Sequence, residues 1–435
     1  MRKRILCLLT AAASLWLCAC SSGTSTTETE RPTETAEPAV TTENATEIAP
    51  VSEFPAVELS RDWGTDEAFN TYVSNTVIST GSNKFIAEAN NITYRAWIPV
   101  EEYGTFDYCF YFSNTVDSTW ARGNREGYVG MPGGAYHISS AFVGDGGSGI
   151  EDEPQNMTPV TFDGGSMEKD VASGETFWSD PVSFTVEEGD YLLWEWTITG
   201  EQIPCICMSG LTPAYADKGQ GFIYVNEIPL PVLFGCNREV KNTVITLGDS
   251  VTQGCDTTSN ECQFWAAELS NMLGKDVSLW NQGLGYARAT DCATGGNWLE
   301  RARYADTVIV GFGTNDIITG KYGEAGSTPA VRIKDAIESI VTVLTDYGCN
   351  VILMSSPPFN LNEEMEAIRT ELNTYIPEIA AANDKVSYFD FAAVLTNPDQ
   401  TNVSLYGDHP NDEGCQLAAE ALMAEYGDLL AGSAE

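Results

Sequence analysis

The chain has 435 residues, with 62 acidic and 22 basic side chains and a formal net charge of −40. So strong a negative charge repels the phosphates of nucleic acids and the headgroups of anionic lipids, which argues against nucleic-acid binding. Neutral substrates are easier to reconcile with this charge, and solubility alone accounts for it.

Residues 1–19 have the pattern of an export signal. Residues 2–4 are basic, residues 5–17 are mostly apolar but too few to span a bilayer, and small residues follow. The end of this segment, Leu17-Cys18-Ala19-Cys20, resembles the lipobox of bacterial lipoproteins. The resemblance implies cleavage before Cys20, a diacylglyceryl thioether on its sulfur, and an extracytoplasmic protein that this lipid anchors to the cell membrane. The alternative is an ordinary secretory signal in which the cysteine has no special role.

Residues 20–55 are rich in Thr, Glu, Ser and Pro and contain almost no large apolar side chains. Such a composition cannot bury enough apolar surface to fold, so it predicts a disordered tether. Cleavage before residue 20 removes three basic residues and no acidic one, which takes the net charge from −40 to −43. No later stretch is long and apolar enough to predict a transmembrane helix.

Residues 56–238 are predicted to form a β-rich accessory domain, a sandwich or jelly roll of antiparallel strands. Strand patterns occur at residues 106–112, 182–186 and 191–198, and glycine-rich turns separate such runs. The aromatic residues suit either stacking on sugar rings or packing in the core. Core packing is the favoured interpretation for four tryptophans, namely Trp97, Trp178, Trp194 and Trp196.

Residues 239–435 show a different rhythm, in which strand patterns alternate with helix patterns. The predicted strands are 243–247, 277–281, 307–312, 351–355 and 386–391, and the predicted helices are 264–273, 299–304, 330–347, 365–382 and 413–430. This alternation predicts an α/β domain with one doubly wound, mainly parallel sheet of about five strands.

Four polar or glycine positions follow these strands. Ser250 comes after the first strand, Gly283 after the second, Asn315 after the third, and His409 lies between the fifth strand and the last helix. Ligands of such sheets bind beyond the carboxyl ends of the strands, so these positions should meet at one edge. A serine nucleophile needs a base, usually imidazole, and the chain has only two histidines. The other one, His137, has a strand pattern around it and is interpreted as an ordinary domain histidine.

Together these residue types suit ester hydrolysis. The hydroxyl of Ser250 would attack the ester carbonyl, and His409 would take its proton and later give it to the leaving alcohol. The backbone N–H groups of Ser250 and Gly283 and the side-chain amide of Asn315 are the candidate donors for the oxyanion. Glycine at position 283 would let the backbone approach the substrate closely.

Four short segments resemble, in order and spacing, the four sequence blocks of the SGNH (GDSL-type) hydrolase superfamily. They are Gly248-Asp249-Ser250, Asn281-Gln282-Gly283, Gly313-Thr314-Asn315-Asp316 and His409-Pro410-Asn411. The resemblance implies a flavodoxin-like sheet with helices on both faces and hydrolysis through an acyl-enzyme. It also implies Ser250 as nucleophile, His409 as base, and Ser250, Gly283 and Asn315 as oxyanion donors. The β-rich half resembles the accessory domain that precedes the catalytic domain in some members, including bacterial carbohydrate esterases.

The sequence departs from the family at one position. The family usually carries an aspartate three residues before the histidine, where this chain has Tyr406. Asp408 is adjacent to His409, and neighbouring side chains generally diverge, so Asp408 is not expected to orient the imidazole. A backbone carbonyl could hold the ring instead, which predicts a Ser–His dyad, and the choice between such a carbonyl and an acidic residue is left open. The substitutions Asp408→Asn and Asp412→Asn should then each retain most activity. A weakened or inactive enzyme is the alternative.

Two further aspartates and the cysteines have structural interpretations. Asp249 suits a cap for a helix that opens at the serine, and Asp316 is also interpreted as structural. Nine cysteines remain beyond residue 20, an odd number. A disulfide between Cys255 and Cys262, which flank the segment after the serine, is left open. No cysteine pair has convincing zinc spacing, and no metal or organic cofactor is implied.

The sequence therefore predicts a lipid-anchored, extracytoplasmic serine esterase. Its expected substrate is an acylated polysaccharide or oligosaccharide, most simply an O-acetyl sugar. Within enzymes, the alternative is a lipase, lysophospholipase or thioesterase. From a different class, the alternative is a non-catalytic surface lipoprotein that binds glycans through its β-rich domain. A binding module has no need of the set Ser250, Gly283, Asn315 and His409.

Overall fold

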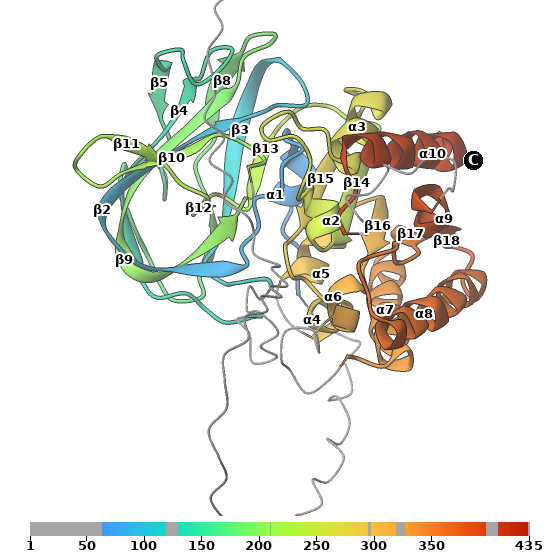
Figure 1. The fold of residues 1–435 in the computed structure, drawn as a ribbon. Coiled ribbons are helices and arrows are strands. Elements are labelled where there is room, and N and C mark those ends of the chain that lie inside the picture. The colour runs from blue at the N-terminus through green and yellow to red at the C-terminus, as the bar shows by residue number, and fades with distance from the viewer. Residues whose placement is uncertain are drawn as a thin grey trace, which may run out of the picture. The chain divides into compact units, whose positions relative to one another are not determined.

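The structure is a computed structural model that describes residues 63–118, 129–208, 210–294, 297–318, 327–396 and 408–433. The predicted export signal, Cys20, the predicted tether and Tyr406 lie outside the described residues. Residues 56–435 form one compact unit, with a strand-rich part and an α/β part (Figure 1). No helix within the described ranges is long and apolar enough to cross a membrane.

The strand-rich part contains two antiparallel sheets, which confirms the predicted sandwich architecture. The first sheet has the order β1 (Val73–Ser74), β13 (Leu233–Cys236), β3 (Gly104–Ser113) and β7 (Thr176–Trp178), with β8 (Val182–Val186) also paired to β3. The second has the order β11 (Phe222–Tyr224), β10 (Ala214–Asp217), β2 (Lys84–Ile98), β9 (Leu192–Cys207), β4 (Tyr136–Asp145) and β5 (Gln155–Pro159). Two short strands join it, β12 (Glu227–Ile228) on β9 and β6 (Lys169–Val171) on β4. A short helix, α1 (Ala68–Thr71), precedes β1.

Aromatic side chains from both sheets form the core of this part. The ring of Phe110 on β3 lies 4.8 Å from that of Trp194 on β9, and Phe234 on β13 lies 5.8 Å from Trp194. Trp97, Trp194 and Trp196 are buried. The core interpretation is therefore right for these three tryptophans. The partly buried Trp178 packs against the core and donates its indole N–H to Asp66 (2.8 Å).

The α/β part contains one sheet of five parallel strands, as predicted. Its order is β15 (Val277–Gly283), β14 (Asn242–Gly248), β16 (Thr307–Gly311), β17 (Asn350–Met354) and β18 (Val386–Phe389). Numbered along the chain, this is the order 2-1-3-4-5 of a flavodoxin-like sheet. The strands consist largely of buried apolar residues because helices cover both faces of the sheet.

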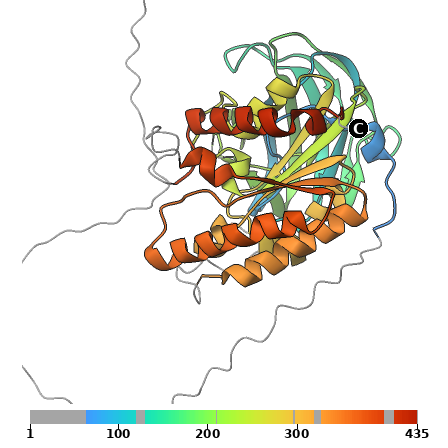
Figure 2. The ribbon, with the colours of Figure 1, turned by 90° about the vertical axis from the view of Figure 1, so that its right-hand side faces the viewer.

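The longer predicted helices are present, and several short ones accompany them. The helices are α2 (Ser250–Gln253), α3 (Trp265–Leu273), α4 (Ala289–Thr294), α5 (Trp298–Ala302), α6 (Thr314–Ile318), α7 (Ala330–Asp346), α8 (Glu363–Ala381), α9 (Phe391–Leu395) and α10 (Asp412–Leu430). Helices α3 and α10 pack together over one face of the sheet, and α7 and α8 cover the other (Figure 2). Helices therefore cover both faces of the sheet, and a substrate site can form at the edge where the strands have their carboxyl ends.

A buried polar seam joins the strand-rich part to the α/β part. Residues 74–83 are buried without interruption, although most of them are polar. Asp117 accepts two hydrogen bonds from the guanidinium of Arg301 on α5, at 3.0 and 2.8 Å, and both side chains are almost completely buried. A polar surface of this kind is stable only because its groups find partners across the seam.

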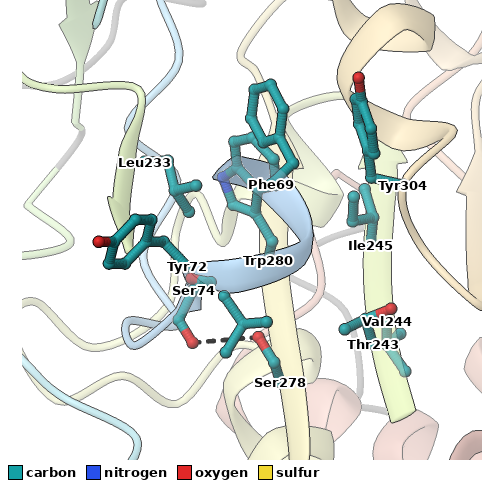
Figure 3. A pocket seen from close by; sticks show the side chains of 11 residues that line it. Phe69, Tyr72, Ser74, Leu233, Thr243, Val244, Ile245, Ser278, Trp280 and Tyr304 are labelled. Carbon is teal, nitrogen blue, oxygen red and sulfur yellow. Dashed lines mark hydrogen bonds between the residues drawn. The ribbon is translucent and has the colours of Figure 1, made fainter. Parts of the chain in front are cut away.

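One small cavity lies within this seam, between the α1–β1 segment and strands β14 and β15 (Figure 3). Phe69 and Trp280 stack beside it with ring centres 6.1 Å apart, and Ser278 Oγ donates to the carbonyl of Ser74 (3.0 Å). None of the predicted site residues lines this cavity. The cavity is therefore a packing feature of the seam, and the predicted site residues lie elsewhere, at the strand ends.

Candidate active site

Ser250 opens helix α2 directly beyond the carboxyl end of strand β14. The preceding residue, Asp249, caps this helix by accepting a hydrogen bond from the amide of Val251 (3.0 Å), as predicted. Glycine is needed at position 248 because a Cβ there would lie 2.0 Å from Thr252 Oγ1. The turn from strand to helix is therefore tight, and it presents the serine at the edge of the sheet.

His409 reaches the serine from the opposite end of the domain sequence. It lies just before α10, whose first turn is capped by the side chain of Asn411 through the amide of Gly414 (2.9 Å). Its Nε2 lies 2.7 Å from Ser250 Oγ, which is hydrogen-bonding distance. The ring of Phe359 meets the imidazole edge-on, 5.3 Å away. The structure therefore brings together the two side chains that the sequence paired as nucleophile and base.

An acidic side chain, and not a backbone carbonyl, holds the other imidazole nitrogen. Asp256 Oδ2 lies 2.9 Å from His409 Nδ1. The expected Ser–His dyad is therefore corrected to a row of serine, histidine and aspartate. The sequence did not show this because Asp256 follows the serine in the chain, whereas the family pattern directs attention to the position before the histidine. The hydrogen bond from His409 lowers the pKa of Asp256, so the carboxylate is ionised near neutral pH.

The loop that carries Asp256 is held by the start of α10. The amide and the hydroxyl of Thr258 both bond to the carboxylate of Asp412, the amide at 2.8 Å. Asp256, Asn260 and Cys262 all have left-handed backbone angles, with φ of 67°, 63° and 52°. Asp and Asn adopt this conformation more readily than other non-glycine residues, whereas it is uncommon for a cysteine. Asp412 therefore acts on the site indirectly, through the loop.

Two of the three predicted oxyanion donors, Ser250 and Asn315, follow the carboxyl ends of the neighbouring strands β14 and β16. As the first residue of α2, Ser250 has an amide without an acceptor inside the helix, and no described residue accepts its hydrogen. Asn315, on the short helix α6 that follows β16, donates from its side-chain amide to the carbonyl of Ala287 (3.1 Å). That bond orients the amide group of Asn315 at the strand ends. Both residues remain candidates for stabilising an oxyanion.

Gly283, the third predicted donor, has a different role in the structure. Its amide donates to the side chain of Asn281 (2.9 Å), so this hydrogen is not directed at a substrate. A Cβ at this position would lie 2.4 Å from the amide nitrogen of Gln253 and 2.6 Å from the carbonyl carbon of Thr252. Glycine is therefore needed for the close packing of strand β15 on helix α2. The sequence predicted that the Gly283 backbone approaches the substrate closely, whereas the structure shows a close approach to helix α2 instead.

Two buried aspartates, Asp249 and Asp316, are sequence neighbours of the candidate site residues Ser250 and Asn315. Burial raises the pKa of Asp249 to about 7. Burial also raises the pKa of Asp316, whose carboxylate accepts hydrogen bonds from the amides of Ala289 (2.8 Å) and Thr290 (3.2 Å). Asp316 thus organises the start of α4, in agreement with its structural interpretation.

The other histidine and the two cysteines near the serine have no part in this site. His137, on strand β4 of the strand-rich part, contacts Asp170 (2.8 Å), in agreement with its interpretation as an ordinary domain histidine. Cys255 Sγ donates to Gln253 Oε1 (3.6 Å) and is a thiol here, as is Cys262, so the structure does not contain the disulfide that was left open. Within the described ranges, no group of His, Cys, Asp and Glu side chains has a geometry that suits a metal ion.

The arrangement has the parts that acyl transfer requires. The hydroxyl of Ser250 lies within hydrogen-bonding distance of an imidazole nitrogen of His409, and the carboxylate of Asp256 holds the other nitrogen. The Ser250 amide and the Asn315 side-chain amide follow the ends of neighbouring strands. Proton transfer along this row converts a weak nucleophile into an effective one.

Residues 246–417 match the model of the GDSL-like Lipase/Acylhydrolase family. No curated protein matches the chain. Similar solved structures include a protein assigned to the lipolytic G-D-S-L family from Desulfitobacterium hafniense DCB-2, at 21% identity over 42% of this chain and 98% of that chain, with a TM-score of 0.35. Another is a member of that family from Veillonella parvula DSM 2008, at 18% identity over 42% of this chain and 98% of that chain, with a TM-score of 0.35. The acetylxylan esterase Axe2 from Geobacillus stearothermophilus is 17% identical over 43% of this chain and 95% of that chain, with a TM-score of 0.36.

Proposed function

We propose that this chain, whose residues 246–417 form a GDSL-like lipase/acylhydrolase domain, is a serine esterase that removes short acyl groups from carbohydrates. The observation that carries the esterase chemistry is the row formed by Ser250 Oγ, the two imidazole nitrogens of His409 and the carboxylate of Asp256, at 2.7 and 2.9 Å.

In the proposed mechanism, His409 Nε2 takes the proton from Ser250 as its oxygen attacks the ester carbonyl. Asp256 accepts the hydrogen on Nδ1, which keeps Nε2 unprotonated and ready, and then stabilises the imidazolium. The imidazolium gives its proton to the departing alcohol, and an acyl-enzyme remains on Ser250. Water, deprotonated by the same imidazole, then releases the acid and restores the serine.

The negative oxygen of each tetrahedral intermediate requires hydrogen-bond donors that are already in place. The amide of Ser250 and the side-chain amide of Asn315 would supply them, without Gly283. Loss of one such donor costs about 3 kcal/mol of transition-state stabilisation. The bond from Asn315 to Ala287 keeps that amide oriented before the substrate arrives.

The openness of the site supports a substrate in which the acyl group is attached to a larger molecule. The side chain of Asp256 is 47% exposed and that of His409 19%, so the catalytic row lies close to the surface. A carbohydrate polymer could not enter a deep tunnel, whereas it can present an O-acetyl group to such a surface. On the strand-rich part, Phe222 and Tyr224 expose aromatic surface of the kind on which sugar rings stack.

Initial rates on nitrophenyl esters of increasing chain length, together with acetate release from acetylated xylan, test this proposal. We expect turnover of acetyl esters, release of acetate from the polymer, and loss of both in Ser250→Ala. Activity confined to long acyl chains would reject the carbohydrate assignment in favour of a lipase or thioesterase. Glycan binding without any ester cleavage by the wild-type protein would reject the esterase assignment itself.

We also propose that the enzyme is exported and held on the cell membrane by a lipid on Cys20. The support is the signal pattern of residues 1–19 and the lipobox-like segment at its end. Labelling of cells with a radioactive fatty acid should mark the wild-type protein and leave the Cys20→Ser variant unmarked. Equal labelling of the two would contradict lipidation at this cysteine.

A further inference from the structure

Two buried side-chain amides close a ring of four hydrogen bonds across the polar seam. Asn83 Oδ1 accepts from the amide of Cys207 (3.2 Å), and the carbonyl of Cys207 accepts from Gln253 Nε2 (2.8 Å). Gln253 Oε1 accepts from the amide of Gly285 (2.7 Å), and the carbonyl of Gly285 accepts from Asn83 Nδ2 (3.3 Å). Each side-chain amide therefore satisfies one N–H and one carbonyl of the backbone. We call these four residues the amide ring.

The amide ring joins the two parts of the molecule. Asn83 and Cys207 belong to the strand-rich part, whereas Gln253 and Gly285 belong to the α/β part. Asn83 and Gln253 are completely buried, so water does not replace a lost bond easily. Turning either side-chain amide over would set its NH₂ against a backbone N–H and its oxygen against a carbonyl. The ring therefore has one favourable arrangement.

Both remaining oxyanion donors are connected to this ring. Gln253 is the last residue of α2, the single helical turn that begins with Ser250. Gly285 lies in the loop after β15, and the carbonyl of Ala287 in the same loop orients the side chain of Asn315 (3.1 Å). A shift of the ring would therefore move the Ser250 amide and the Asn315 amide relative to each other.

We propose that Asn83 and Gln253 are positioning residues for the oxyanion donors, and that the strand-rich part thereby supplies a component of the active site. This inference rests on the proposed esterase function. It gives the strand-rich part a role in turnover that is distinct from binding a glycan. A misplacement of about 1 Å in such a site costs roughly 100-fold in rate.

The test compares Asn83→Ala and Gln253→Met with the control Asn242→Ala. Asn242 is also a buried asparagine that donates to a backbone carbonyl, that of Leu430 (2.8 Å), but it lies at the opposite, amino end of strand β14. Kinetics on nitrophenyl acetate are measured well below each melting temperature, together with the rate at which a phosphonate labels Ser250. The two readouts separate positioning from a general loss of stability.

We expect kcat and the labelling rate to fall about 10- to 100-fold in both ring variants with KM little changed. In Asn242→Ala only the melting temperature should fall. Ring variants that keep kcat within about twofold of the wild type would overturn the proposal, and if Asn83→Ala does not fold, Gln253→Met decides by the same criteria. A wild-type protein that neither turns over esters nor reacts with the phosphonate would instead disprove the esterase function, and this inference with it.

Discussion

Asp256 is the residue on which the base depends most directly. Its pKa lies below the usual value because of its hydrogen bond to His409, although 47% of its side chain is exposed. A carboxyl group with a lowered pKa contributes stability above its ordinary pKa, and this contribution is lost as the pH falls through the lowered value. At neutral pH the carboxylate therefore keeps the imidazole oriented.

Replacing this carboxylate should slow turnover without unfolding the protein. We expect Asp256→Asn to lower kcat about 100- to 1,000-fold, because an amide can present an N–H to Nδ1 and favour the wrong imidazole tautomer. Asp408→Asn, the control, should retain most activity. Steady-state kinetics on nitrophenyl acetate measure both. Asp412→Asn should lower kcat by less than Asp256→Asn does, because Asp412 acts only by holding the Asp256 loop through Thr258. An unchanged kcat in Asp256→Asn would contradict a catalytic role for Asp256 and would favour a Ser–His dyad.

Asp249 should make stability depend on pH in the opposite sense. Its folded-state pKa is raised to about 7 by burial, so the folded protein holds this proton more tightly than the unfolded chain. Its contribution to stability therefore falls as the pH rises from about 4 to 7. Asn is also a good helix cap and does not titrate. The stability advantage of Asp249→Asn over the wild type should therefore be larger at pH 8.5 than at pH 5.5, by on the order of 1 kcal/mol in the free energy of unfolding. Urea unfolding at both pH values measures this, and an equal difference at the two would contradict it.

At the scale of elements, three strand ends and one helical turn determine where the serine lies. Gly248 pairs in register with Gly283 on one side and with Gly311 on the other. Helix α2 packs directly on this row, with Thr252 close to the positions that a Cβ of Gly248 or Gly283 would occupy. Because these three glycines carry no side chain, the short helix can lie close to the sheet.

Gly283→Ala should therefore push α2 away from β15. The added methyl would meet backbone atoms of Thr252 and Gln253, at 2.6 and 2.4 Å, and backbone atoms cannot move aside cheaply. We expect a loss of about 1–3 kcal/mol in the free energy of unfolding, together with a fall in kcat. In Gly311→Ala, the matched control, the methyl would meet only Met354 and Thr252 side-chain atoms at 3.5 and 3.6 Å or more, so little should change. Similar losses in both variants would refute this account.

The elements with strong periodicity could be predicted, and the short ones could not. The five parallel strands are short, mostly buried apolar runs, and the longer helices, such as α7 and α10, bury apolar residues at helical spacing. Helices α2, α4, α6 and α9 have six residues or fewer, too few for a period to be read. They form because tertiary contacts and caps satisfy their ends, as Asp316 does for α4.

At the scale of the molecule, the buried seam ties the strand-rich and α/β parts into one cooperative structure. We expect a single calorimetric transition, because neither part can expose this seam without losing partners for buried polar groups. Asp117→Asn should move the whole transition down by the equivalent of about 3–5 kcal/mol, since it leaves the guanidinium of Arg301 without its carboxylate. Two separate transitions in the wild type would contradict the argument.

The sequence by itself determined the sheet, its longer helices, the placement of Ser250, Asn315 and His409 at one edge, and the interpretation of Asp249 as a cap. These follow from periodicity and from local signals that neighbouring residues carry. Only the tertiary structure decided that Asp256 holds His409, that Gly283 packs on α2, and that Asn83 closes a ring with Gln253. Each of these depends on contacts between residues distant in the chain or on the path of a loop, and neither leaves a repeating pattern in the sequence.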